Sequence, residues 1–333
     1  MKKLIASITV SMLTLAFFSN AHADDSSHPP EPTITDHSLE FAGTTYTLFS
    51  TYTDTESARS HFTSKYPEFF ASAEHNYGLP PLSEENATDY KELAISLSEN
   101  SDSVETYRDV VSFLDYYENS QQNKEITDAA TAFAHKIEAG QLSEKEAAAQ
   151  LALLLPLTKE NNNMRLPYGT RNSGINLQAA QLYAAKHAPD GYHNPTFGYE
   201  MSRKGYGVDC TNFVSQILHA GGVPMDYGAD EFGGWWWKSR TNRSISWVRA
   251  RTFAAYMGSG YTAQVWVDIF NNVRPGDIIG LDETSDGDVD HLGFIHSKNA
   301  SKLLIAQHSP DYFSWRHKWS RHERVGTYHR IRR

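Results

Sequence analysis

The sequence of 333 residues contains a single cysteine, Cys210. One cysteine excludes an internal disulfide, and it also excludes zinc and iron–sulfur centres built from several cysteines. Basic residues are fewer than acidic ones, 30 Lys and Arg against 40 Asp and Glu, so the formal charge of −10 argues against a general nucleic-acid-binding protein. The histidines of the second half lack the HxxxH or HxH spacing typical of metal sites. We therefore expect no cofactor and no bound metal.

Long apolar runs are scarce as well. The one clear run, Leu4–Phe18, follows Lys2 and Lys3 and precedes Ala21-His22-Ala23, which is the pattern of a secretory signal peptide. The run is shorter than the ~20 residues that span a bilayer, no cysteine follows it for a lipid anchor, and no later segment is apolar enough to cross a membrane. We predict a signal peptide over residues 1–23 and an exported, soluble protein, periplasmic or extracellular.

Charge divides the remaining chain in two. Asp24–Arg165 holds 9 basic and 25 acidic residues, whereas Leu166–Arg333 holds 19 and 15. Such asymmetry favours separate domains with separate tasks. We predict an N-terminal domain over 24–156, a polar, Asn-rich linker over 157–169 and a C-terminal domain over 170–333.

The N-terminal domain has the pattern of a short hairpin followed by helices. Leu39–Tyr52 alternates around the turn Ala42-Gly43-Thr44, and residues 56–155 are mostly helical in pattern, with a capping motif at Ser143–Glu146. No catalytic constellation is found in this half. We favour a packed helical bundle with an acidic surface, and its role as a spacer, a targeting module or a pro-region stays open.

The C-terminal domain places the single cysteine at the start of a helix. An Ala-rich helix is predicted over Ile175–His187, and the apolar spacing after Cys210 predicts a second helix that ends at Gly221-Gly222. The positive end of a helix dipole and its free N–H groups stabilise a thiolate and can hold an oxyanion. Cys210 is therefore a candidate nucleophile.

Strands that follow supply a candidate base. Val273–Leu281, His291–Ser297 and Lys302–His308 have the pattern of consecutive strands in an antiparallel meander, which predicts an α+β fold. A cysteine on a helix beside a histidine on a sheet is the arrangement of thiol hydrolases, in which imidazole takes the thiol proton. His291 is the candidate base.

The ordered motifs DCTNFVSQ with Gly-Gly, WWW, SW, PGDII and DxDxDH resemble the putative amidase domain of bacterial secreted proteins, a family similar to papain-like cell-wall hydrolases. The resemblance covers about residues 168–333. It implies a papain-like fold of an N-terminal helix with the cysteine packed on an antiparallel sheet with the histidine. It also implies Cys210 as nucleophile, His291 as base, and an orienting group on the next strand.

For that orienting group we favour His308, with Gln307 and Asp311 as rivals. Strand alternation puts only one of Gln307 and His308 on the active-site face, and the sequence does not tell which. Asp209, beside the nucleophile, is expected to be a helix cap or a hydrogen-bond anchor rather than a base.

Two further motifs have alternative interpretations. The alternating carboxylates Asp286, Asp288 and Asp290 suit a calcium loop, but the later Glu and flanking helices of an EF-hand are missing, so we favour a tight hairpin loop. The run Trp235–Trp237 suits the lining of a substrate cleft or, as we prefer, a packed position at the edge of the core with one ring exposed.

These observations predict a secreted cysteine hydrolase that cleaves amide bonds. Peptidoglycan stem peptides of the cell wall are the leading substrate by the resemblance. A protease or toxin-like deamidase that acts on proteins is the enzymatic alternative, and a non-catalytic cell-envelope binding module is the alternative from another class. The oligomeric state is not predicted.

Overall fold

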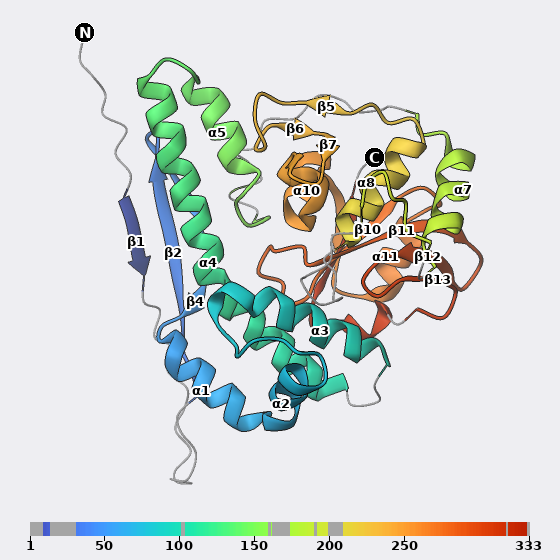
Figure 1. Ribbon diagram of the computed structural model, residues 1–333, viewed down its shortest axis with the longest axis horizontal. Helices are drawn as coiled ribbons and strands as arrows, with labels where there is room; N and C mark the ends of the chain where they lie inside the picture. The colour runs from blue at the N-terminus through green and yellow to red at the C-terminus, as the bar shows by residue number, and fades with distance from the viewer. Residues whose placement is uncertain are drawn as a thin grey trace. The chain divides into compact units, whose positions relative to one another are not determined.

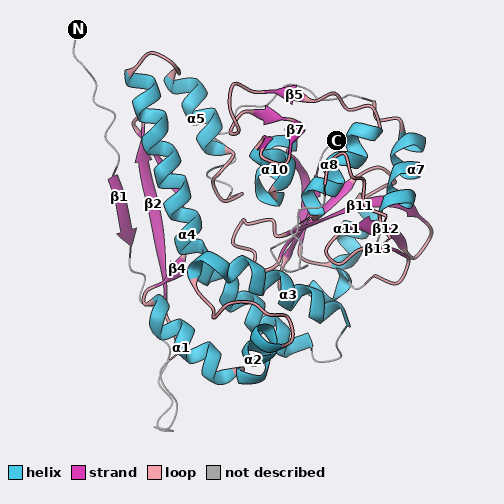
Figure 2. Ribbon diagram, in the orientation of Figure 1, coloured by secondary structure: helices cyan, strands magenta, loops and turns pink. Residues whose placement is uncertain are grey.

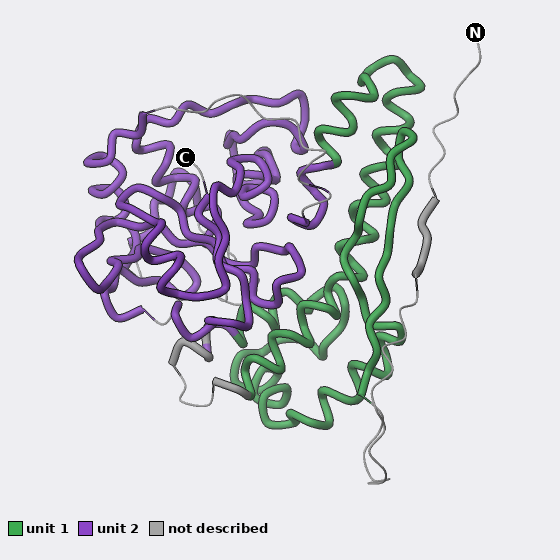
Figure 3. Tube along the Cα trace, turned by 180° about the vertical axis from the view of Figure 1, so that it is seen from behind, with its two compact units in different colours: residues 1–94, 103–151 green, residues 95–102, 152–333 purple. Residues whose placement is uncertain are grey.

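A computed structural model describes residues 9–13, 31–100, 104–158, 161, 174–189, 192–198, 209–317 and 319–331. The chain forms two compact units (Figure 3). Unit 1 comprises residues 1–94 and 103–151, and unit 2 comprises residues 95–102 and 152–333. Unit 1 is mainly helical and unit 2 is built on a sheet, so the expected mixed α+β architecture is confirmed. Within the described ranges, no helix is long and apolar enough to span a bilayer.

Unit 1 begins with a small antiparallel sheet. Its strands are β1 (Thr9–Leu13), β2 (Ile34–Phe41), β3 (Thr44–Thr47) and β4 (Thr51–Tyr52), and β2 pairs with the other three. The predicted hairpin is present, and Ala42 and Gly43 form its turn with φ of 50° and 76°. Strand β1 falls within the predicted signal peptide, the rest of which lies outside the described residues.

Helices make up the rest of unit 1. They are α1 (Thr55–Lys65), α2 (Pro67–His75), the short η1 (Glu84–Asn86), α3 (Ala87–Asn100), α4 (Val104–Glu138) and α5 (Glu144–Ala152) (Figure 1). The rings of Phe62 and Phe113 stack 4.4 Å apart and join α1 to α4. The predicted capping motif is confirmed, because Ser143 Oγ accepts from the Glu146 N–H at 3.2 Å and Glu146 accepts from the Ser143 N–H at 3.0 Å.

Unit 2 holds both helices predicted for the C-terminal domain. They are α7 (Leu177–His187) and α8 (Cys210–Ala220), and α8 ends at Gly221, before Gly222 with φ of 89°. The other helices are α9 (Ile245–Val248), α10 (Ala250–Met257), α11 (Trp266–Asn272) and the short η2 (Trp319–His322). Leu157, where we predicted the linker to begin, donates its N–H to the Gly287 carbonyl at 2.8 Å.

A six-stranded antiparallel sheet forms the centre of unit 2 (Figure 2). Its strands are β9 (Ser259–Ala263), β10 (Ile278–Asp282), β11 (His291–Lys298), β12 (Leu303–Gln307), β13 (Tyr312–Ser314) and β14 (Thr327–Ile331), in the order β13-β12-β11-β10-β14-β9. Short two-stranded ribbons, β5 (Asp226–Tyr227) with β6 (Gly234–Trp235) and β7 (Trp237–Ser239) with β8 (Asn242–Arg243), lie between α8 and α9 in the sequence. The predicted meander β10-β11-β12 is confirmed.

Each face of this sheet packs against a different cluster. On the face that we call the first face, Leu292, Phe294 and Ala306 join the cluster of α7 and α8 that contains Cys210 and Phe213. On the second face, the cluster is formed by Ile279, Leu281, Ile295, Ile305, Trp319 and residues of α11. Neighbouring residues of β11 and β12 therefore point to opposite faces, as the twofold period of a strand requires.

The tryptophan run differs from its prediction, because none of its rings is exposed. Trp235, Trp236 and Trp237 expose 0%, 4% and 7% of their surface. Trp235 and Trp237 join the cluster of Cys210, whereas Trp236 turns away and donates its indole N–H to the Gly233 carbonyl at 2.9 Å. The run therefore crosses the core and lines no open cleft.

Candidate active site

Cys210 is the first residue of α8. It is 3% exposed, and its Sγ lies 3.6 Å from Thr211 Oγ1. Asp209, the residue at the N-cap position, makes no side-chain hydrogen bond to the helix backbone. The first N–H groups of α8 are thus not capped by this carboxylate. The positive end of a helix dipole favours negative charge at such a position.

Asp209 instead anchors two neighbouring side chains. Its carboxylate accepts a hydrogen bond from Asn212 Nδ2 at 2.8 Å and contacts His308 Nδ1 at 2.5 Å. Asn212 also accepts from Trp247 Nε1 at 2.9 Å, which fixes the start of α8 to the core. Of the two roles expected for Asp209, the structure shows the hydrogen-bond anchor and not the helix cap.

His308 is held at the N-terminus of α8 from three sides. Besides the Asp209 contact, its Nε2 donates to the His187 carbonyl at 2.8 Å, and its ring stacks on Phe213 with centroids 3.7 Å apart and planes within 8°. The imidazole therefore bridges the end of β12, the C-terminus of α7 and the N-terminus of α8. Its two nitrogens thus face a carboxylate and a carbonyl, and both of these groups accept hydrogen bonds.

A second histidine–carboxylate pair lies beside His308. His193 Nε2 is 2.5 Å from Asp311 Oδ2, and the His193 and His308 rings are 5.0 Å apart in a T-shaped contact. The ligating atoms of His193, His308 and Asp311 lie within 4.8 Å of one another. Since both His308 nitrogens are already engaged, these contacts make a hydrogen-bond network rather than an open metal centre. The absence of a bound metal stays a prediction.

The lack of metal-like spacing predicts only a structural or surface role for His193. This residue precedes α8 by 17 positions and lies in a loop, with no spacing motif that relates it to Cys210. Asp311 was considered only as a rival for the orienting group. The signal that could have found Asp311 is the Ser309-Pro310 dipeptide, a turn pattern that directly follows His308.

Gln307 and His291 lie on the second face of the sheet. Gln307 accepts from Trp319 Nε1 at 2.9 Å and donates to the Pro310 carbonyl at 3.2 Å. The His291 ring is 5.5 Å from the Trp319 ring, and neither of its nitrogens has a hydrogen-bond partner among the described residues. The structure thus brings His308 to the end of α8 that carries Cys210, and it directs His291 away from the first face.

Burial keeps His291 neutral. The ring is 4% exposed, and desolvation lowers its pKa to about 4, an effect that the nearby Gln307 carboxamide and Glu283 carboxylate offset only in part. Burial also lowers the pKa of His317 and His329 to about 4. All three rings belong to unit 2, so this unit is expected to be acid-sensitive.

We predict that unit 2 loses stability as the pH falls from about 6.5 to 4. In the unfolded chain these histidines bind protons below about pH 6.5, whereas in the folded chain they stay neutral until about pH 4. Between these two pH values protonation therefore favours the unfolded chain, and the full stability is present above about pH 6.5. The expected loss is on the order of 1–3 kcal/mol per buried histidine. Urea unfolding at pH 7.5, 6 and 5 measures it, and His291→Gln should flatten the pH dependence. An unchanged slope in that variant would contradict the neutral, buried state of His291.

The Asp-rich loop between β10 and β11 is stabilised by its own carboxylates. Asp286 accepts from the Asp288 N–H at 2.8 Å, Asp290 accepts from the Glu283 N–H at 2.8 Å, and Asp288 lies 3.4 Å from the buried Arg251 guanidinium. These are the contacts expected of a hairpin loop. The calcium interpretation of Asp286, Asp288 and Asp290 stays a prediction.

Comparisons with known proteins cover the segment that contains these residues. Residues 174–330 match the family described as "Putative amidase domain". Two uncharacterized proteins of Bacillus subtilis (strain 168) are similar to this chain. YhbB is 32% identical over 119 residues, which cover 35% of this chain and 38% of YhbB. YjcM is 32% identical over 159 residues, which cover 45% of this chain and 34% of YjcM. The chain thus spans little more than a third of these relatives. No solved structure matches it significantly. The family match indicates a hydrolase that acts on amides.

Proposed function

We propose that this protein is a cysteine hydrolase that cleaves amide bonds, with Cys210 as the nucleophile. The observation that carries the proposal is the placement of Cys210 at the first turn of α8, with the Asp209–His308 pair at the same end of the helix, inside the segment that matches the amidase family. The helix on one face of an antiparallel sheet, with a histidine at the end of β12, also suits a papain-like fold.

In the proposed reaction, the Cys210 thiolate attacks the amide carbonyl carbon. The carbonyl oxygen takes the negative charge, and the N–H groups at the start of α8, that of Cys210 included, stabilise it. The C–N bond then breaks, the leaving amine takes a proton, and an acyl-thioester remains on Cys210. Water hydrolyses this thioester, and the carboxylate product leaves with the thiolate restored.

We assign the proton transfers to His308. Its ring lies at the N-terminus of α8, and Asp209 holds its Nδ1, so Nε2 is the nitrogen that transfers protons. In the reaction, Nε2 leaves the His187 carbonyl, gives a proton to the leaving amine and then takes a proton from water. The resemblance gives this role to His291 instead. That assignment stays a prediction from the motif, and the contact of His291 with Trp319 on the second face favours His308.

For the substrate we propose stem peptides of bacterial peptidoglycan, in an exported protein whose first 23 residues are removed. The proposal rests on the resemblance and on the signal-peptide pattern, since a fold alone does not fix a substrate. Protein amides, cleaved in proteolysis or deamidation, are the alternative.

Incubation with purified peptidoglycan and mass spectrometry of the released fragments tests this substrate. We expect new peptide termini with the wild-type protein and none with Cys210→Ala. Release by both proteins would assign cleavage to another site, and release by neither, combined with cleavage of a general protein substrate, would favour the protease alternative.

A further inference from the structure

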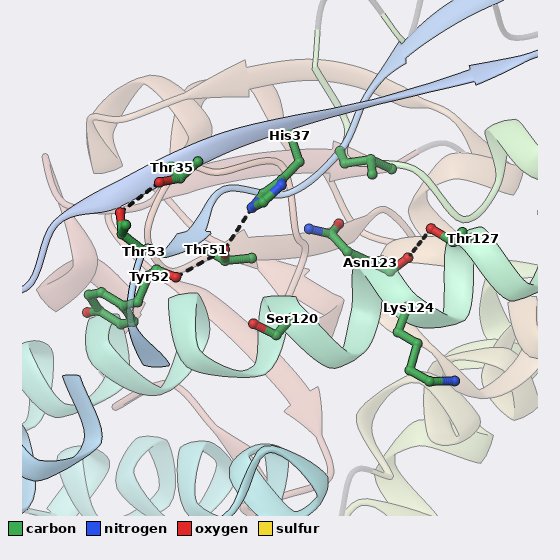
Figure 4. Close-up of a pocket in the computed structure, with 10 residues that line it drawn as sticks. Thr35, His37, Thr51, Tyr52, Thr53, Ser120, Asn123, Lys124 and Thr127 are labelled. Atoms are coloured by element: carbon green, nitrogen blue, oxygen red, sulfur yellow. Dashed lines mark hydrogen bonds between the residues drawn. The ribbon is translucent and has the colours of Figure 1, made fainter. Parts of the chain in front are cut away.

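A cavity that opens to solvent lies in unit 1, and its lining residues are remote in sequence from the cysteine. Its volume is about 410 Å³, within the range of roughly 300–1,000 Å³ typical of small-molecule sites. It is lined by ten residues from β2, β4, α4 and the segments that flank these strands: Thr35, His37, Leu48, Thr51, Tyr52, Thr53, Ser120, Asn123, Lys124 and Thr127 (Figure 4).

The lining is unusual for the inner side of a helix packed on strands. Ser120, Asn123 and Thr127 follow one another at helical spacing on α4, and Figure 4 shows Asn123 and Thr127 on the side of the helix toward β2. A helix face that packs on a sheet is ordinarily apolar, because burying polar groups costs free energy. Here all the lining residues except Leu48 and Tyr52 are polar. The surface that they expose to the cavity nevertheless holds more carbon than nitrogen and oxygen, so it suits an occupant that presents both hydroxyl groups and C–H surface.

The polar groups are already ordered by contacts with one another. His37 Nε2 lies 2.8 Å from Thr51 Oγ1, and the hydroxyls of Thr35 and Thr53 are 2.7 Å apart. The Asn123 carboxamide is bound to the backbone of Phe49 through both its oxygen and its nitrogen. Each hydroxyl keeps capacity for a further hydrogen bond, since it offers one donor and two acceptors. The site is therefore largely preformed.

The cavity offers hydroxyls rather than a net charge. Burial lowers the pKa of His37 although Asp36 opposes the shift, so its ring is neutral at pH 7. Lys124 points away from β2 in Figure 4 and pairs with Asp128 at 2.6 Å on the exposed side of the helix. A ligand with both donors and acceptors and without formal charge fits such a lining. Carbon atoms, those of Leu48 and Tyr52 among them, make up the larger part of the surface exposed to the cavity.

We propose that this cavity binds a neutral saccharide, whose hydroxyl groups exchange hydrogen bonds with the threonine, serine and histidine side chains while its C–H surface packs on Leu48 and Tyr52. The proposal does not depend on the chemistry at Cys210. It gives unit 1 a binding function in place of the spacer, targeting or pro-region roles that the sequence leaves open.

The full chain offers a matched pair of variants for the test. Thr127 and Thr131 lie one turn apart on α4, and each donates its hydroxyl to the carbonyl four residues before it, at 2.8 Å and 2.9 Å. Thr127 lines the cavity, whereas Thr131 is exposed. Valine at either position removes one hydroxyl with the same change of shape. A difference between the two variants therefore reports on the cavity and not on the helix.

Ligand-observed NMR titration with N-acetylglucosamine and its β-linked disaccharide measures binding. We expect saturable binding by the wild-type protein and equally by Cys210→Ala, a dissociation constant about 3- to 10-fold higher in Thr127→Val, and no change in Thr131→Val. Ser120→Leu, which fills the cavity, should abolish binding without loss of the helical circular dichroism signal. Absence of saturable binding by the wild-type protein, equal effects of the two valine variants, or tighter binding of charged glucosamine or glucuronate would overturn the proposal.

Discussion

Replacement of Cys210 by serine is expected to abolish amide hydrolysis and to leave the fold intact. A serine hydroxyl at this position is not ionised at neutral pH, so the helix dipole has no anion to stabilise and the nucleophile is lost. The expected fall in kcat is roughly 10³-fold or more, as for removal of a nucleophile from other covalent catalysts. The fall is measured by the release of fragments from the substrate that the wild-type protein cleaves.

The fold of this variant is checked separately. Cys210 is buried, and Thr211 Oγ1, 3.6 Å from its sulfur, can serve as partner for the new hydroxyl. Thermal unfolding should therefore occur within a few degrees of the wild-type midpoint. Full activity in Cys210→Ser would exclude a thiol mechanism, whereas loss of activity together with loss of folding would leave Cys210→Ala to decide.

Replacement of His308 by glutamine is expected to reduce kcat by about 10²- to 10⁴-fold, the usual effect of removing an acid–base group. The matched variant is His291→Gln, which changes a buried histidine of the same sheet on its second face. We expect this variant to keep activity within about tenfold of the wild type, because its ring contacts Trp319 rather than the end of α8.

The reverse result would contradict the geometric assignment. If His291→Gln lost activity by 10²-fold or more and His308→Gln kept it, the base would be the histidine that the motif indicates, and His308 would serve as an anchor for α7 and α8. Both variants are compared at equal folded fraction, judged by near-ultraviolet circular dichroism, since each removes a buried ring.

Local patterns predicted most of the elements that form the site. The apolar spacing after Cys210 and the Gly221-Gly222 pair predicted α8, and the alternation of residues 273–308 predicted the meander. Outside the site, the alternation of Leu39–Tyr52 around Ala42-Gly43-Thr44 predicted the hairpin of β2 and β3. Each of these features is fixed by residues close together in the sequence.

Features that depend on tertiary packing could not be predicted in this way. The twofold period of β12 places Gln307 and His308 on opposite faces, but it does not say which face meets α8. That choice is made by the stacking of His308 on Phe213 and the contact with Asp209, about 100 positions away. The ring of His291 contacts Trp319 on the second face, and its pairing with Cys210 stays a prediction from the motif.

The pH dependence of Cys210 alkylation tests the central claim most directly. Because Cys210 is the only cysteine, iodoacetamide labelling followed by mass spectrometry of the intact protein reports on this thiol alone. The midpoint of the rate profile measures ionisation of the sulfur, and it does not depend on how accessible the buried thiol is. We predict a midpoint below pH 7 for the wild type and for His291→Gln, and a rise toward the ordinary value of about 8.5 in His308→Gln. A wild-type midpoint near 8.5, equal to that of the urea-unfolded chain, would contradict an activated nucleophile at Cys210.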